Sequence, residues 1–139
     1  MPAPQPPVDL DIAGIDAALG RKGTADSGLY KYTIARQDTI TDGGQVVPPT
    51  FGVTTTINFQ PVGAGRAAIN GDLVMTGPEV QKAIQALRAG NIALVTLHNH
   101  SLTDEPRLFY AHYWAVDDAV TLAKAMRPVL DASKLQPGK

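Results

Sequence analysis

Hydrophobic and polar positions alternate strictly along residues 53–60, which predicts a β-strand with two unlike faces. One face carries Val53, Thr55, Ile57 and Phe59, and the other carries Thr54, Thr56, Asn58 and Gln60. Segments 28–36 and 66–75 have the same β-prone composition. Segment 39–47 turns at Asp42-Gly43-Gly44, which favours a hairpin. Such a hairpin is either a mobile flap or a plain surface ribbon, and the ribbon is the more common outcome.

Three other segments show helical spacing. Residues 9–19 carry an apolar stripe that stops at Gly20. Thr76 and Glu79 match a capping box, which predicts a helix that stops at Gly90. A last helix begins near residue 116 or 117, and Pro128 should bend or end it. Its inward positions are Val120, Ala123, Met126 and Val129.

This order of elements predicts an α+β fold: a largely antiparallel sheet with about three helices packed on it. The single domain is expected over residues 9–133. Residues 1–8 are rich in proline and are predicted to be disordered, and residues 134–139 are predicted to be a flexible tail.

All three histidines of the chain lie between positions 98 and 112. A β-prone run at 92–97, predicted to be a buried strand, leads into His98 and His100, which share one face. Turn-forming residues follow at 101–106, and 108–114 is the predicted return strand with His112. A turn centred on Glu105 places His112 opposite His98, and a turn centred on Asp104 places the two diagonally.

This spacing favours a metal site with His98, His100 and His112 as ligands. Glu105 would be a fourth ligand or a proton-transfer group. Zinc is the first choice, and nickel, copper(II), manganese and iron(II) also accept nitrogen and oxygen ligands. In a catalytic site the metal would serve a hydrolase or a lyase. The alternative is that the histidines are ordinary packed or surface residues.

Polar residues on the neighbouring strands are weaker candidates. Asn58 and Gln60 could orient ligand histidines, although such a stripe is more often the solvent face of a sheet. Asp72 is a further candidate ligand, although an exposed or capping role is more common for such a residue.

Composition narrows the range of functions. The 139 residues are 44% hydrophobic and 18% charged, which indicates a globular domain. A net charge of −1 without a basic run argues against nucleic acid as the main partner. The absence of cysteine excludes disulfides and thiolate metal sites. No apolar run approaches the ~20 residues of a membrane helix.

Several runs closely resemble the bacterial LppY/LpqO family. They are His98-Asn99-His100, 105–109 and 112–114, together with 18–23, 57–61 and Gly71-Asp72. The resemblance covers roughly residues 10 to 130 and implies a domain of unknown function. Some members look like exported lipoproteins. The resemblance therefore favours a periplasmic or exported protein, with a signal or lipid anchor trimmed before the proline-rich start, over a cytosolic one.

Two looser similarities concern the histidine spacing alone. His-x-His followed by Glu105 looks like the first metal motif of cupins, but His112 stands where that motif has glycine, which argues against a cupin barrel. The spacing to the third histidine also looks like the zinc ligands of acetolactate decarboxylases and of the related plant-and-prokaryote conserved domain. Both similarities imply compatibility with a metal and no particular reaction.

Two non-catalytic alternatives remain. The domain can be an envelope module that carries a metal or a small-molecule ligand. It can also be a structural or interaction domain in which aromatic residues pack a core or a partner face, namely Phe109, Tyr110, Tyr113 and Trp114. The sequence leaves the oligomeric state open.

Overall fold

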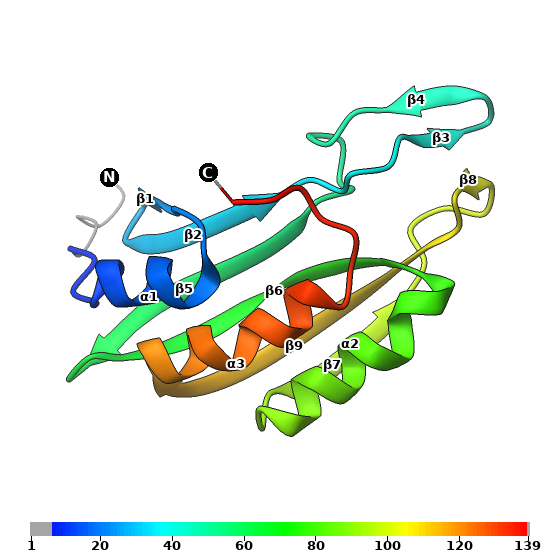
Figure 1. The fold of residues 1–139 in the computed structure, drawn as a ribbon. Coiled ribbons are helices and arrows are strands. Elements are labelled where there is room, and N and C mark those ends of the chain that lie inside the picture. The colour runs from blue at the N-terminus through cyan, green and yellow to red at the C-terminus, as the bar shows by residue number, and fades with distance from the viewer. Residues whose placement is uncertain (1–6, 139) are drawn as a thin grey trace, which may run out of the picture.

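The computed structural model describes residues 7–138, which form two β-sheets and three helices (Figure 1). This architecture confirms the predicted α+β class. The predicted disordered segment 1–8 lies outside the described residues except for Pro7 and Val8. The elements in chain order are α1 (Ile12–Leu19), β1 (Thr24–Asp26), β2 (Leu29–Ile34), β3 (Ile40–Asp42), β4 (Gln45–Val47), β5 (Thr55–Gly63), β6 (Arg66–Thr76), α2 (Gly77–Ala89), β7 (Ala93–His98), β8 (Asp104–Glu105), β9 (Leu108–Asp118) and α3 (Ala119–Asp131).

The larger sheet has the strand order β1-β2-β5-β6-β9-β7, and all neighbours are antiparallel. Its longest pairing joins β6 and β9, from Arg66 opposite Asp118 to Thr76 opposite Leu108. β9 lies between β6 and β7, so helix α2 crosses over β9 to connect the two strands that flank it. The smaller sheet has the order β4-β3-β8.

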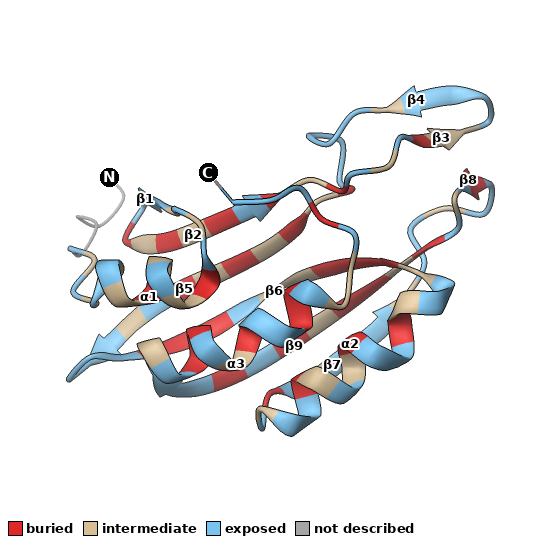
Figure 2. Cartoon of the chain, viewed as in Figure 1, coloured by how far each residue is buried: buried red, intermediate tan, exposed pale blue. Residues whose placement is uncertain are grey.

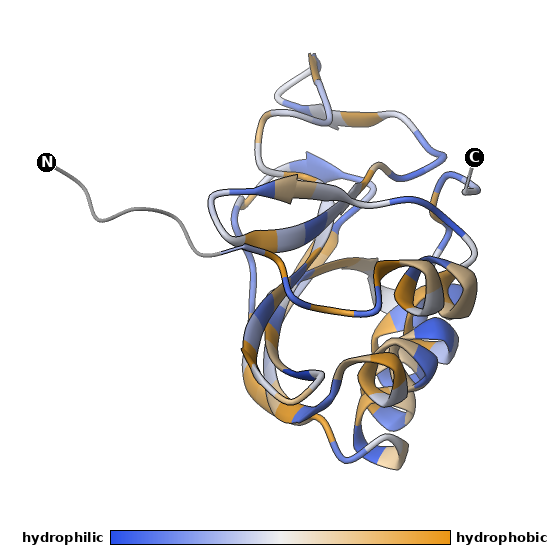
Figure 3. Cartoon of the chain, turned by 90° about the vertical axis from the view of Figure 1, so that its left-hand side faces the viewer, coloured by the Kyte–Doolittle hydropathy of each residue, from blue (hydrophilic) through white to orange (hydrophobic). Residues whose placement is uncertain are grey.

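All three helices lie on one side of the larger sheet (Figure 3), and α3 contacts both α1 and α2. The apolar stripes of the helices face the sheet and bury the main core. Its fully buried members include Ile15, Leu19, Ile57, Phe59, Ile69, Met75, Leu87, Tyr113 and Met126. Figure 2 shows this buried layer between helices and strands.

The opposite face of the sheet has a smaller core at one end only. There the small sheet covers Ile40, Val53, Val74, Leu108 and Tyr110, which form a separate apolar cluster. Among the described residues no helix covers the rest of this face, which we call the open face.

Helix boundaries differ from the prediction in two places. α1 begins at Ile12 rather than residue 9, because the Asp11 side chain accepts a hydrogen bond from Gly14 N and caps the helix. α3 begins at Ala119, because β9 continues to Asp118. The helix also passes through Pro128 to Asp131. The missing N–H removes only the helix hydrogen bond to the carbonyl of Lys124, and the buried Val129 and Leu130 hold the last turn against the core.

Two segments have strand structure that the sequence did not predict. Residues 24–26, between the predicted helix at 9–19 and the predicted strand at 28–36, form the edge strand β1 against β2. β5 continues past Gln60 to Gly63 with an irregularity between Pro61 and Gly63. The predicted capping box is present: Glu79 accepts from Thr76 N at 2.7 Å at the start of α2.

Strand β7 is an edge strand, and the prediction that it is buried was wrong. Val95 and Leu97 are 59% and 45% exposed. An apolar run of this length does not distinguish a strand covered on both faces from an edge strand. β7 does pair with the predicted return strand, β9.

The predicted flexible tail is packed against the domain over residues 134–138. Leu135 is 7% exposed and forms a β-bridge with Arg36. Gln136 N donates to the carbonyl of Ala35 at 2.8 Å. The apolar Leu135 is the residue that anchors this segment.

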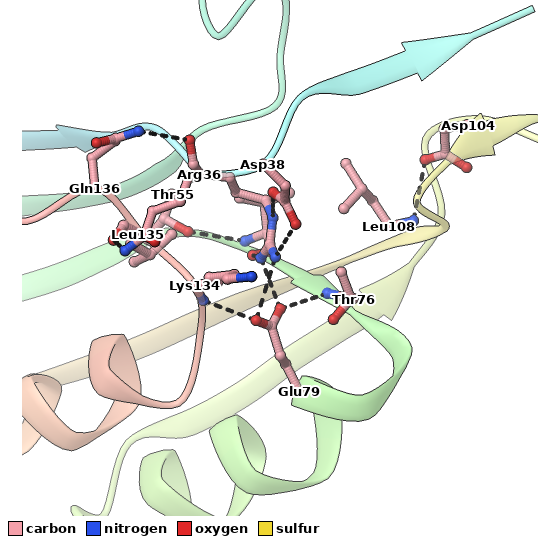
Figure 4. Close-up of polar contacts among 12 residues, drawn as sticks. Arg36, Asp38, Thr55, Thr76, Glu79, Asp104, Leu108, Lys134, Leu135 and Gln136 are labelled. Atoms are coloured by element: carbon pink, nitrogen blue, oxygen red, sulfur yellow. Dashed lines mark hydrogen bonds and ion pairs between the residues drawn. The ribbon is translucent and has the colours of Figure 1, made fainter.

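A buried ion-pair network joins the end of β2, the start of α2 and the C-terminal segment (Figure 4). The side chain of Arg36 is 2% exposed and donates to Glu79 at 2.7 Å and to Asp38 at 2.8 Å. Glu79 also accepts from Lys134 N at 2.8 Å. Burial alone would raise the pKa of Glu79, but these hydrogen bonds and the charge of Arg36 outweigh it, so the pKa is lowered.

We expect Glu79→Gln to lower the free energy of unfolding by about 2 kcal/mol at pH 7, because it removes the charge that pairs with Arg36. The pKa of Glu79 is lower in the folded chain than in the unfolded chain, so its charge stabilises the fold at any pH above the unfolded-chain pKa. This stabilisation is lost as pH falls through the folded-chain pKa. The difference in free energy of unfolding between Glu79→Gln and the wild-type protein, measured by urea titration, should therefore become smaller toward pH 3. Glu105→Gln, the same change at an exposed position, is the control. An equal effect of both variants would contradict the prediction.

Candidate functional site

The three histidines gather on the open face, beside the small sheet. His98 ends β7, His100 follows in the next loop and His112 lies in the middle of β9. His98 pairs with Tyr110 and His112 pairs with Thr96, so His98 and His112 are diagonal neighbours. Of the two predicted registers, the one centred on Asp104 is the one observed.

The imidazole ring of His98 lies close to both of the other histidine rings. The ring centroid of His98 lies 5.1 Å from that of His100 and 4.9 Å from that of His112, with interplanar angles of 24° and 26°. Two imidazoles on one tetrahedral zinc ion have centroids about 5 Å apart, given a Zn–N distance near 2 Å. The two centroid distances from His98 are therefore of the size that two imidazoles on one ion require.

Contacts with backbone carbonyls indicate which ring nitrogen carries the proton in two of the histidines. Nδ1 of His112 lies 3.3 Å from the carbonyl oxygen of Gly71, and Nδ1 of His98 lies 3.3 Å from that of Asn99. A carbonyl only accepts hydrogen bonds, so Nδ1 carries the proton in these contacts. Each Nε2 then keeps a free lone pair, as in histidines that bind metals.

Asp72 is the carboxylate next to this cluster. It pairs with His112 across β6 and β9, and its Oδ1 lies 3.5 Å from His112 Nδ1. The Asp72 side chain is 24% exposed, and Oδ1 is buried without a hydrogen-bond donor. Burial raises the pKa of Asp72, and the nearby histidines only partly oppose this. Asp72 therefore does not have the exposed or capping role that is more common for such a residue.

His100 lies flat on Tyr110, with ring centroids 3.4 Å apart and an interplanar angle of 5°. This packing removes water from part of the His100 ring and lowers its pKa, while Asp72 acts in the opposite direction. Burial, together with Asp104 and Asp72, raises the pKa of Tyr110 to about 12. From the sequence, Tyr110 was considered only as an aromatic residue of a core or a partner face. Tyr110 lies two positions before His112, and in a strand this spacing indicates that both side chains are on the same face.

Glu105 is not part of the cluster. It is exposed in β8, opposite Thr41 of the small sheet, and no contact with a histidine is present among the described residues. Asn58 also makes no hydrogen bond with a histidine; its Nδ2 donates to Asn70 Oδ1 at 3.1 Å. Gln60 is exposed farther along β5. The nearby carboxylate is thus Asp72, because β6 rather than β8 lies beside His112.

A shallow groove of about 420 Å³ runs along the open face next to this cluster. Its lining includes Thr56, Asn58, Asn70, Asp72, His112 and Trp114. Within residues 7–138, no group of three or more His, Cys, Asp or Glu side chains is arranged as a ready metal site.

A family model described as Domain of Unknown Function (DUF1259) matches residues 13–132. The chain belongs to this family. The match covers the three histidines and Asp72, so the whole cluster lies within the DUF1259 domain. No curated protein and no solved structure matches the chain. No helix in the described part of this DUF1259 domain is long and apolar enough to cross a membrane.

We expect Asp72→Asn to stabilise the metal-free protein at pH 7, raising Tm by about 1 to 3 °C. The pKa of Asp72 is higher in the folded chain than in the unfolded chain, so its ionisation costs stability as pH rises through these values. The increase in Tm should become smaller toward pH 3, where the carboxyl group of Asp72 becomes protonated in both the folded and the unfolded state. Thermal unfolding at both pH values measures this. Asp117→Asn, at an exposed position of β9, is the control and should have no such effect.

The same substitution should lower the pKa of His100 further, because Asp72 raises it in the wild-type protein. The ring-proton resonance of His100, followed by NMR through a pH titration, reports this pKa. A shift toward higher pH in Asp72→Asn would contradict the geometry of the cluster.

Proposed function

We propose that this domain binds a divalent metal, zinc in the first place, through His98, His100 and His112. The observation that carries the proposal is that the His98 ring centroid lies about 5 Å from those of both His100 and His112, with the partly buried carboxylate of Asp72 beside His112. His98 thus has both other imidazoles at the distance expected of two ligands on one ion, and an acidic oxygen without a hydrogen-bond donor lies beside His112.

In this proposal the carboxylate that supports the histidines is Asp72 rather than Glu105. Its Oδ1 faces Nδ1 of His112, so it can hold that ring and offset the charge of a cation bound at Nε2. A buried acidic oxygen without a donor costs stability, which is a common feature of functional sites. We therefore assign Asp72 as a positioning residue rather than a direct ligand.

Three protein ligands leave a fourth position on zinc for water or a small molecule. A metal with such a position supplies the means to polarise a carbonyl or to activate water, which is the chemistry of hydrolases and lyases. The groove beside His112 and Asp72 gives a small molecule access to that position. The lowered pKa of His100 keeps its imidazole neutral, as a ligand must be, to a lower pH than usual.

The decisive experiment is calorimetric titration of zinc into protein purified without a histidine tag and stripped with a chelator. We expect one site per chain. His98→Ala and His112→Ala should each weaken binding by about 100-fold, and Asp72→Asn by about 10- to 100-fold. Glu105→Gln should leave the affinity unchanged.

Circular dichroism of each variant separates a lost site from a lost fold. Zinc binding that is equal in wild type and in the double variant His98→Ala, His112→Ala would refute the metal proposal. A loss of affinity in Glu105→Gln but not in Asp72→Asn would refute the assignment of the carboxylate.

The relationship to the LppY/LpqO family is a finer part of the same proposal. It rests on the resemblance of the runs around the histidines and Gly71-Asp72. From this resemblance we infer that the domain works in the bacterial envelope, either as a metal enzyme or as a carrier of a metal or small ligand.

A further inference from the structure

A second cavity, of about 580 Å³, lies on the other side of His100, between the β3–β4 hairpin and the larger sheet. This volume is typical of pockets for small molecules. Its apolar wall includes Ile40, Val47, Pro48, Phe51, Val53 and Tyr110. Phe51 is 76% exposed at this cavity, so a large apolar surface is available to an occupant.

Two carboxylates lie among the polar residues of this cavity, beside Gln45, His100 and Ser101. Asp42 and Asp104 line it, and no lysine or arginine does. The Asp42 carboxylate accepts hydrogen bonds from the hydroxyls of Ser101 and Thr103, which lower its pKa. It is therefore ionised at neutral pH and repels an anion.

The carboxylate of Asp104, which lines this cavity, is only partly hydrogen-bonded. Its side chain is 5% exposed, and Oδ2 accepts from Leu108 N at 3.3 Å (Figure 4). Oδ1 is buried without a hydrogen-bond donor and makes only a long ion pair with Nε of Arg107, at 3.7 Å. Buried polar atoms are nearly always hydrogen-bonded, so this oxygen points to a donor that a ligand would supply.

We propose that the cavity binds a small amphipathic amine. The aromatic or aliphatic body of the amine lies against Phe51 and Tyr110, and its ammonium group donates to Asp104 Oδ1. Two acidic side chains and an apolar wall select a cation with an apolar body over an acid with the same body. This inference goes beyond the metal proposal, because none of these contacts requires a metal.

The test uses three probes with one aromatic body: phenethylamine, phenethyl alcohol and phenylacetate. Each is titrated into the metal-free, isotope-labelled protein, and amide NMR shifts of Ile40, Gly52 and Tyr110 are followed. For molecules of this size we expect a Kd of about 1 mM for the amine. The alcohol should bind about 10-fold more weakly, and phenylacetate more weakly still.

Two variants locate the interaction. Asp104→Asn should weaken the binding of the amine about 10-fold and leave the affinity for the alcohol unchanged. Asparagine keeps the size of aspartate and one acceptor oxygen but lacks its charge. Phe51→Ala, at an exposed loop position, should weaken both amine and alcohol. Val62→Ala, an exposed apolar position outside the cavity, is the control.

Several results would overturn the proposal. These are binding of phenylacetate as tight as that of the amine, no saturable shift with the amine, or equal affinity of amine and alcohol. Because the titrations contain no metal, failure here leaves the zinc experiment untouched. Failure of the zinc experiment likewise leaves this result untouched.

Discussion

The antiparallel pairing of β6 with β9 is the constraint on which the candidate site depends. Successive side chains of a strand point to opposite faces, so odd positions of both strands face the helices and even positions face the open side. Tyr113 is buried among the helices, whereas its neighbour His112 meets Asp72 on the open face. A slip of one residue would exchange these faces, burying the polar residues and exposing the core.

One glycine secures this pairing. Tyr113 OH donates to the carbonyl oxygen of Thr56 at 2.8 Å, and it reaches that oxygen across Gly71. A Cβ at Gly71 would lie 1.9 Å from the same carbonyl and 2.5 Å from the tyrosine oxygen. The strands can therefore lie at this spacing only with glycine at position 71, directly before Asp72. The structural requirement of the core thus fixes the position of the candidate functional carboxylate.

The β3–β4 hairpin is more than a surface ribbon, because it orders the segment that carries His100. β3 pairs with β8, and Asp42 accepts hydrogen bonds from Ser101 and Thr103 in the loop that follows His100. The hairpin also forms one wall of the apolar cavity beside His100. A change in the hairpin would therefore reach the histidine cluster and the cavity together, through the same hydrogen bonds.

The sequence by itself determined the local elements and the parity of the histidines. Alternation within 53–60 and the capping box at Thr76 depend on residues only a few positions apart, and β5 and the start of α2 confirm both. His98 and His100 were expected on one face of a strand, and their ring centroids lie 5.1 Å apart although His100 follows the end of β7. Only the tertiary structure decided which carboxylate joins the histidines. Glu105 is closer to them in sequence, but β8 turns away to pair with β3, while β6 brings Asp72 beside His112. Strand order depends on contacts between residues far apart in the chain, and no local pattern encodes those contacts.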